Sequence, residues 1–266
     1  MMQVFIHSIG IAGPGLDGWA ASRPILAGLA EHRLAPTANT IPDMLSAAER
    51  RRSSHAARLA ILAAQEALRG GEVPGEKMAT VFASSDGDGD ITQQICESLA
   101  CPAREVSPTS FHNSVFNAPA GYWSLATGSR LASTSICAYD VSFAAGLIEA
   151  ACFAVVEQQP VMLIASDLPF PSPLHTIRPV EQSFAAALLM TSAAGRTSSM
   201  RWHIGLDAHR PPTPFPSGLP DSLRSNPAAR CLPLLAMLAC NRADQVTLDY
   251  SDSSSLIVTC EPGHDR

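Results

Sequence analysis

The sequence lacks any CxxC pair. Its seven cysteines are odd in number and scattered along 266 residues, at positions 96, 101, 137, 152, 231, 240 and 260. A disulfide framework or a zinc site normally shows closely and regularly spaced cysteines. We therefore expect neither of them, and we predict free thiols, most of them buried as small apolar side chains.

Basic residues are few, and only the run "ERRR" at 49–52 gathers them. Lys and Arg number 18 against 24 Asp and Glu, so the formal net charge is −6. This balance makes neither nucleic acid nor an anionic membrane surface a natural partner.

Long apolar runs are also missing. The most apolar stretch, 150–165, is interrupted by Glu157, by two glutamines and by Pro160, so we expect no membrane-spanning segment. The first ten residues have neither the basic start nor the continuous apolar run of a signal peptide. We therefore expect a cytoplasmic protein.

Several catalytic and metal-binding motifs are absent. No GxSxG elbow of a serine hydrolase occurs. Asp86, Asp88, Asp90 and Glu97 fall at calcium-loop spacing, but the glycine that such a loop requires at its sixth position is Ile91. We predict a polar loop that leads into a helix, with no metal and no cofactor.

What the sequence does contain, up to residue 196, is an alternation of two kinds of apolar segment. Runs rich in β-branched residues predict strands, and apolar residues at helical spacing predict helices. The predicted strands cover 3–13, 78–85, 131–137 and 160–168, and the predicted helices cover 46–71, 90–100 and 111–128, with another helix ending at 150. This alternation predicts a layered α/β fold with a partly parallel sheet.

The sequence pattern changes beyond residue 197. A proline-rich connection at 209–220 precedes a predicted helix at 226–240 and a predicted closing hairpin at 245–260. Hydrophobic residues make up 46% of the chain, and the mean hydropathy of +0.11 is slightly high for a protein in water, which indicates that a partner covers some apolar surface.

The stretch 131–150 predicts a strand, a tight turn and a helix, with Cys137 and Asp140 at the turn. A helix N-terminus presents backbone N–H groups and the positive end of the helix dipole, which lower the pKa of a thiol placed there. The turn is therefore a suitable place for a reactive cysteine.

Residues 107–123, "SPTSFHNSVFNAPAGYW", and the strand "PVMLIASD" at 160–167 resemble the β-ketoacyl synthases of the thiolase superfamily. The resemblance covers most of residues 1–195. It implies a thiolase-like layered fold, in which a mixed five-stranded sheet lies between helices, with a truncated second half. Residues 1–196 then correspond to the N-terminal half of a ketosynthase, and residues 197–266 to a reduced remnant of the second half packed on it.

The resemblance also bears on the nucleophile. A gap-free alignment places the active cysteine of the family at Asp140, whereas aligning Cys137 requires a three-residue deletion before it and a compensating insertion after it. A carboxylate is a poor acyl acceptor, because the anhydride hydrolyses easily while a thioester persists. We therefore expect Asp140 to be a degenerate nucleophile position that caps the following helix, with Cys137 as its rival.

The two catalytic histidines of the family are missing as well. Ser225, Asn226 and Pro227 stand where the corresponding family helix opens with Gly-His, and no histidine lies near the closing hairpin. In these losses the chain is similar to the ketosynthase-like chain-length factors, most closely those of aryl polyene pathways. The resemblance implies a protein that is not an enzyme, that forms a heterodimer with a β-ketoacyl synthase subunit and shapes its acyl tunnel, and that meets acyl carrier protein indirectly.

The family also indicates an interface and a gate. Family dimers pair the strand before the nucleophile across a twofold axis, which corresponds here to Ser133, Thr134, Ser135 and Ile136. The family's tunnel-gate segment corresponds to Ser110, Phe111, Ser114, Val115 and Phe116. The rings of Phe111 and Phe116 either plug the tunnel by overpacking or are ordinary core aromatics.

Two other functions stay open at this level. One is a reduced but active acyltransferase that uses Cys137 as its nucleophile, with His112 or a late histidine as the base. The other is a stand-alone acyl-binding or homodimeric scaffold.

Overall fold

The strands described for residues 1–38, 41–195 and 200–262 of this computed structural model form one sheet, in the order β4-β3-β5-β6-β1-β7-β9-β8 with β2 paired to β1. The strands are β1 (Met2–Gly13), β2 (Leu16–Asp17), β3 (Ala79–Ala83), β4 (Ser133–Ile136), β5 (Val161–Asp167), β6 (Phe184–Thr191), β7 (Met200–Ala208), β8 (Asp244–Asp249) and β9 (Ser254–Pro262).

The direction of the strands confirms the expected mixed sheet. β4, β3 and β5 run parallel, and the other neighbours run antiparallel. The five strands from β4 to β1 form the mixed sheet that the sequence predicted. β7 then pairs with β1, with Trp202 opposite Val4, and brings β9 and β8 into the same sheet.

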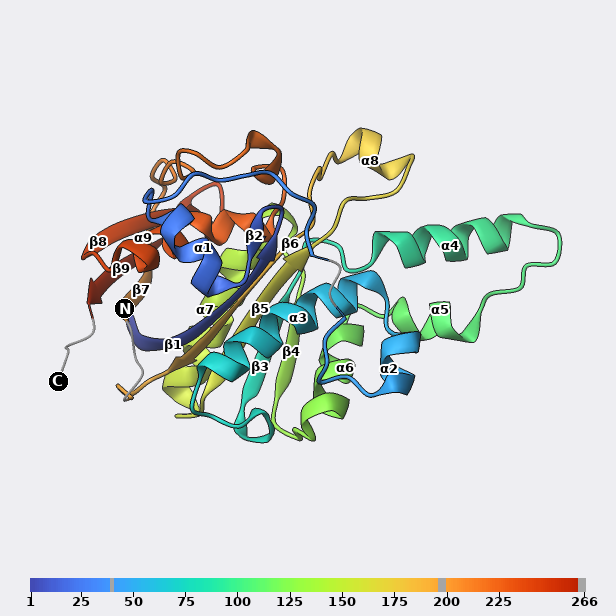
Figure 1. Cartoon of the computed structure of the whole chain (residues 1–266), viewed down its shortest axis with the longest axis horizontal. Helices are drawn as coiled ribbons and strands as arrows, with labels where there is room; N and C mark the ends of the chain where they lie inside the picture. The colour runs from blue at the N-terminus through green and yellow to red at the C-terminus, as the bar shows by residue number, and fades with distance from the viewer. Residues whose placement is uncertain (39–40, 196–199, 263–266) are drawn as a thin grey trace.

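Helices cover both faces of the sheet (Figure 1). They are α1 (Trp19–Leu26), α2 (Ala47–Arg52), α3 (His55–Gly70), α4 (Gly89–Ala100), α5 (Pro108–Asn113), α6 (Ala118–Thr127), α7 (Ser142–Val156), α8 (Leu174–Ile177) and α9 (Leu232–Cys240), with 3-10 turns η1 (Gly75–Lys77), η2 (Tyr139–Val141), η3 (Asp221–Leu223) and η4 (Ala228–Cys231).

The core has two layers because neighbouring residues of a strand point to opposite faces. Val81 and Leu163 belong to the apolar cluster that contains α7 and α9, whereas Phe82 and Ile164 belong to the cluster that contains α3 and α6. Every residue of β3 is buried. This explains why the central parallel strands are continuous apolar runs in the sequence.

The helix predicted over 46–71 is two helices. α2 ends at Arg52, the chain turns at Ser53, and α3 begins at His55. The Ser54 hydroxyl accepts a hydrogen bond from the backbone N–H of Ala57, so a serine N-cap starts a new helix at this point.

The helix predicted over 111–128 is also divided. α5 already begins at Pro108 and ends at Asn113, and α6 starts at Ala118. Pro119 falls in the first turn of α6, where the missing N–H of proline costs no helical hydrogen bond. A proline in the middle of a helix would break it, so two helices result.

Residues Tyr139–Val156 form a helical segment that is long and apolar enough, by length and composition, to cross a membrane. In the fold, α7 packs against β3 and β5, and buried side chains such as Phe143 and Leu147 belong to the core. The position of α7 in the core accounts for its apolar composition.

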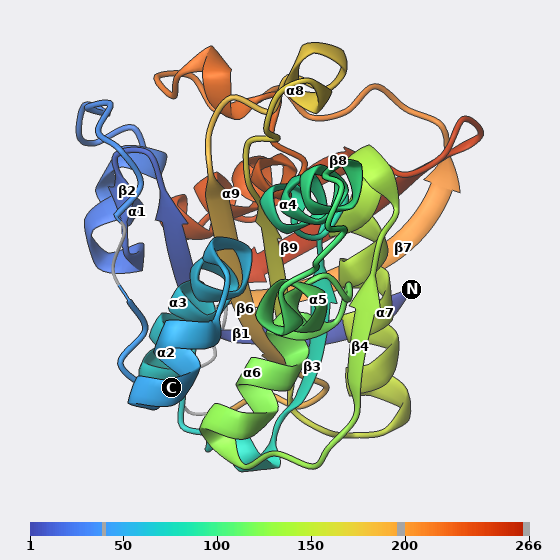
Figure 2. The same ribbon diagram turned by 90° about the vertical axis from the view of Figure 1, so that its right-hand side faces the viewer.

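The two margins of the sheet differ. β4 hydrogen-bonds to β3 on one side, and no strand in the described part of the chain pairs with its other side (Figure 2). The other margin, β8, is flanked by the proline-rich connection. There the N–H of Thr213 donates to the carbonyl of Thr247 at 2.9 Å, and the N–H of Thr247 donates to the Thr213 hydroxyl at 2.9 Å.

The expectation that most cysteines are buried is wrong. Cys231 and Cys260 are buried and Cys152 is partly buried, but the other four are exposed. Two of these, Cys96 and Cys101, lie on or next to α4, which projects from the body of the protein (Figure 1). Most residues on such a projection lie away from the core.

Candidate functional site

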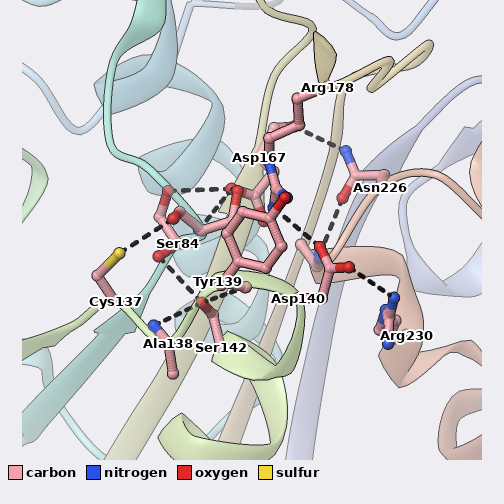
Figure 3. Close-up of polar contacts among 12 residues, drawn as sticks. Ser84, Cys137, Ala138, Tyr139, Asp140, Ser142, Asp167, Arg178, Asn226 and Arg230 are labelled. Carbon is pink, nitrogen blue, oxygen red and sulfur yellow. Dashed lines mark hydrogen bonds and ion pairs between the residues drawn. The ribbon is translucent and has the colours of Figure 1, made fainter.

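The turn between β4 and α7 is the structural elbow that the sequence predicted. Tyr139 has a φ of 51°, a left-handed conformation that is uncommon for a residue with a bulky side chain. The buried Ser142 stabilises the turn: its hydroxyl accepts from the N–H of Ala138 at 2.9 Å and donates to the carbonyl of Tyr139 at 2.7 Å. The carbonyl of Ser84 is a second acceptor, at 3.2 Å (Figure 3).

Asp140 lies at this elbow, in η2, and its carboxylate faces two arginines. Oδ1 is 2.9 Å from Arg178, and Oδ2 is 3.2 Å from Arg230 (Figure 3). The expectation that Asp140 caps α7 is wrong, because Val141 occupies the N-cap position and no side chain caps the helix. Charge-assisted bonds to two guanidinium groups are stronger than bonds to neutral backbone N–H groups, which explains the difference.

Arg178 connects the elbow to the segment 168–183 between β5 and β6. Its guanidinium carbon is 3.6 Å from the centroid of the Tyr139 ring and 5.8 Å from that of Phe170. The Arg178 side chain is only 14% exposed. A guanidinium group placed over an aromatic ring with water largely excluded gives a favourable cation–π contact.

Asp167 lies behind the elbow, at the carboxyl end of β5, and is fully buried. Its Oδ1 accepts from the N–H of Ser85 at 2.7 Å, from the Ser85 hydroxyl at 2.8 Å and from the Ser84 hydroxyl at 3.1 Å. Burial raises the pKa of Asp167 to about 6, and these hydrogen bonds oppose the shift.

Asn226 joins the C-terminal part of the chain to this network. Its amide nitrogen donates to the carbonyl of Asp167 at 2.9 Å and to that of Gln182 at 2.8 Å. Its side-chain oxygen accepts from the N–H of Ala228 at 2.9 Å. Asn226 is one of the residues that stand where the resemblance places Gly-His, and its side chain is buried and fully used in bridging segments.

Cys137 follows β4 directly and is exposed. Its thiol donates to the carbonyl of Ser85 at 3.0 Å. The side-chain contacts described for His112 and for the late histidine His203 lie elsewhere. The ring of His112 meets Tyr122 edge to face, with centroids 6.1 Å apart, and His203 lies 3.8 Å from Glu261. The described contacts therefore bring no imidazole to this thiol.

A cavity of about 290 Å³ adjoins the elbow. Its walls come from the elbow and the first turn of α7 on one side, and from the proline-rich connection, η4 and β8 on the other. Asp140, Arg230 and Asp249 form its charged side, where Arg230 is 3.4 Å from Asp249, and Phe143 and Phe215 form apolar wall. The elbow thus faces a mixed polar and apolar space rather than an imidazole pair.

The five gate residues lie together at the end of α5 and in the turn that follows it. Phe111 is 68% exposed and Val115 is 49% exposed, so neither belongs to the core. Phe116 is partly buried and lines a cavity of about 30 Å³ with Val115 and Phe82. Of the two readings of Phe111, that of an ordinary core aromatic is wrong.

In sequence, no curated protein matches the chain. In structure, it is similar to a chain in "Ketosynthase (ApeO) in Complex with its Chain Length Factor (ApeC) from Xenorhabdus doucetiae", with a TM-score of 0.73, 22% identity, and coverage of 97% of this chain and 100% of that chain. It is similar to a chain of the ishigamide ketosynthase/chain length factor, with a TM-score of 0.76, 12% identity, and coverage of 98% and 99%.

A ketosynthase of the bacillaene polyketide synthase from Bacillus amyloliquefaciens is also similar, with a TM-score of 0.57, 13% identity, and coverage of 77% of this chain but 45% of that chain. At these identities the likenesses establish the thiolase-like fold. The family model "Beta-ketoacyl synthase, N-terminal domain" matches residues 19–243, which is most of the chain. The fold and the elbow agree with this family match, and the chain therefore belongs to the β-ketoacyl synthase N-terminal domain family.

Proposed function

We propose that this protein is a non-catalytic chain-length factor. It forms a heterodimer with an active β-ketoacyl synthase in the cytoplasm and shapes the acyl tunnel in which that partner elongates a chain carried by acyl carrier protein. The observation that carries the proposal is the Asp140 carboxylate, which is held by Arg178 and Arg230 at the elbow where the gap-free alignment places the family nucleophile.

The chemistry of the elbow supports a non-catalytic role. A carboxylate that is neutralised by two guanidinium groups is a weaker nucleophile than a free one, and an acyl anhydride on it would be short-lived. Acyl transfer also needs a general acid or base close to the reacting atoms. The ion-pair partners of Asp140 are arginines, which remain protonated and do not serve as bases at neutral pH.

The sheet supports a partner at β4. Strands at the edge of a sheet present unpaired backbone groups, which proteins normally cover or pair. Among the described residues, the outer side of β4 has neither a strand nor a flanking segment of the kind that covers β8. Antiparallel pairing of Ser133–Ile136 with the equivalent strand of a ketosynthase would cover it.

The solved relatives support the identity of the partner. Two of them are described as a ketosynthase with its chain length factor, and this chain covers 99% or more of the matched chain in each. By contrast, it covers less than half of the matched chain of the bacillaene ketosynthase. In length, the chain is therefore comparable to chains from the complexes.

Co-expression tests the proposal directly. We expect the chain to co-purify as a one-to-one complex with a complete ketosynthase from the same genome. The complex should condense an acyl thioester with malonyl-acyl carrier protein, and the chain alone should not. A stable homodimer of the chain that binds no ketosynthase, seen by size-exclusion chromatography with light scattering, would contradict the proposal and support the stand-alone scaffold.

The gate is tested through product length. Phe116→Ala and Phe111→Ala are assayed as purified complexes with the ketosynthase, so that weaker binding is not mistaken for a changed product, and the variant that removes a plug should lengthen the product. Leu125→Ala is the matched control, since Leu125 is 67% exposed on α6, outside the gate segment. Unchanged products from both phenylalanine variants would remove these rings from the gate.

A second candidate function, acyl transfer by Cys137, is favoured by the exposure of that thiol. Against it, the thiol donates to the Ser85 carbonyl, a role that the nucleophilic thiolate cannot fill. Intact-mass analysis after incubation with an acyl carrier protein thioester distinguishes the two functions. Acylation of the wild type that is lost in Cys137→Ala would favour the enzyme.

A further inference from the structure

α4, α5 and the loop between them project from the body of the protein (Figures 1 and 2). We call this projection, with the loop at its base, the arm, residues 86–113. α4 buries only Ile91, and α5 buries only Asn113. Leu99 is 50% exposed and Phe111 is 68% exposed. Large apolar side chains on a projecting element cannot be covered by the chain's own core, so they indicate contact with another protein.

The arm is also strongly acidic. It carries five carboxylates, Asp86, Asp88, Asp90, Glu97 and Glu105, and one arginine, Arg104. The arm therefore contributes four of the six excess negative charges of the chain.

None of these five carboxylates takes part in an ion pair described for the residues in the structure. At the base of the arm, the Asp88 side chain accepts from the N–H of Ile91 and caps α4. Near the tip, Glu97 accepts from the neutral amide of Gln93 at 2.7 Å. At the base of the arm, Asp86 and Asp90 interact electrostatically with Arg178 and His55, respectively. Toward the tip, Glu97 and Glu105 have no described ion-pair partner.

The charge of the arm indicates which kind of protein it binds. In a pair of identical chains both arms have the same sign, and the rest of each chain is also net negative. Like charges placed across an interface oppose association, and complementary charges steer it. A second copy of this chain is therefore a poor partner for the arm, and a protein with basic surface is a good one.

We propose that the arm docks into an apolar groove rimmed by Arg and Lys on the ketosynthase partner. The apolar side chains Leu99 and Phe111 enter the groove, and Glu97 and Glu105 pair with its rim. This inference rests on the proposed function and adds the chemistry of the partner surface. It predicts that the chain prefers this different protein over a second copy of itself.

The test compares two double charge reversals with the same change in net charge. Glu97→Lys/Glu105→Lys acts on the arm, and Glu72→Lys/Glu76→Lys acts on exposed residues between α3 and β3. All four side chains are exposed, so both variants should fold, which circular dichroism and thermal unfolding verify. The probe is a complete, tagged ketosynthase from the same genome, and the affinity is measured by biolayer interferometry.

We expect the arm variant to bind about tenfold more weakly than wild type at about 50 mM NaCl, mainly through a slower association rate, and the control to stay within about twofold. The difference should shrink to less than about twofold at about 500 mM NaCl, where surface charges are screened. Equal affinity and equal salt dependence of the two variants, or tighter binding by the arm variant, would overturn the inference. Absence of any complex with the wild type would contradict the proposed function instead.

Discussion

The guanidinium carbon of Arg178 lies 3.6 Å from the centroid of the Tyr139 ring, while the same side chain binds the neighbouring Asp140 at 2.9 Å. One arginine therefore holds both residues of the elbow. Arg178 precedes β6, and Asp140 precedes α7. These contacts therefore join two segments that lie 38 residues apart in the chain.

Removal of this arginine should weaken the fold. We expect Arg178→Ala to lower the free energy of unfolding by roughly 2 kcal/mol, because it removes a shielded cation–π contact and one partner of Asp140. The control is Arg242→Ala, whose side chain is 74% exposed and pairs with the half-exposed Asp244, and it should cost less than about 0.5 kcal/mol. Urea titration measures both, and equal losses would refute a special role for Arg178.

Asp167 should make stability depend on pH. Its pKa is raised to about 6 in the folded protein from the ordinary 3.8, so the folded state holds the proton more tightly than the unfolded state. The contribution of protonated Asp167 is fully present below about pH 4 and is lost as the pH rises through about 6.

The variant Asp167→Asn isolates this effect, because it keeps an oxygen acceptor for Ser85 and cannot titrate. From about pH 4 to about pH 7, wild type should lose on the order of 3 kcal/mol relative to the variant. The measurement is the free energy of unfolding at several pH values. A difference that stays constant, or that changes in favour of wild type, would show that burial does not raise this pKa.

Two helical glycines should respond oppositely to alanine. A Cβ on Gly146, in α7, would lie 2.8 Å from the Cβ of Ala83 and 2.9 Å from Leu163, whereas a Cβ on Gly121, in α6, would meet nothing within 4 Å. Gly146→Ala should therefore destabilise the protein by about 2 kcal/mol through overpacking. Gly121→Ala should stabilise it by about 0.5–1 kcal/mol through helix propensity. Thermal unfolding decides, and the same sign for both would contradict close packing of α7 on the sheet.

The thiols should fall into two reactivity classes. Burial raises the pKa of Cys231 and of Cys260 above the usual range, so neither is available as a thiolate in the folded state. Native protein treated with iodoacetamide should be labelled at the exposed cysteines Cys96, Cys101, Cys137 and Cys240. Peptide mass mapping should find Cys231 and Cys260 modified only after denaturation, and their rapid labelling in native protein would contradict the packing of η4 and β9.

Local sequence patterns predicted most of the sheet. The apolar runs at 3–13, 78–85 and 160–168 match β1, β3 and β5 closely, since a strand buried on both faces leaves a continuous signal. The breaks at Ser53 and after Asn113 were missed, although a serine cap at Ser54 and a proline at Pro119 were visible signals for a new helix in each case.

The elbow was predictable as a turn, but its chemistry was not. The partners of Asp140 lie 38 and 90 residues away along the chain, and no local pattern reports such contacts. Asp167 carried one usable signal, its place at the carboxyl end of a parallel strand, where polar groups of α/β folds gather. Asn226 was noticed as a departure from the family pattern, but its bridging role needed the structure.

The proline-rich flank of β8 has a consequence for how far such a protein can assemble. Proline has no N–H to donate to a neighbouring strand. The proline-rich connection along β8 therefore makes this far margin of the sheet unsuited to pairing with another strand. Under the proposed pairing of β4, strand addition therefore stops after one partner. The two chains would then share one continuous sheet, and the fibres that a sheet with two receptive margins can nucleate would be avoided.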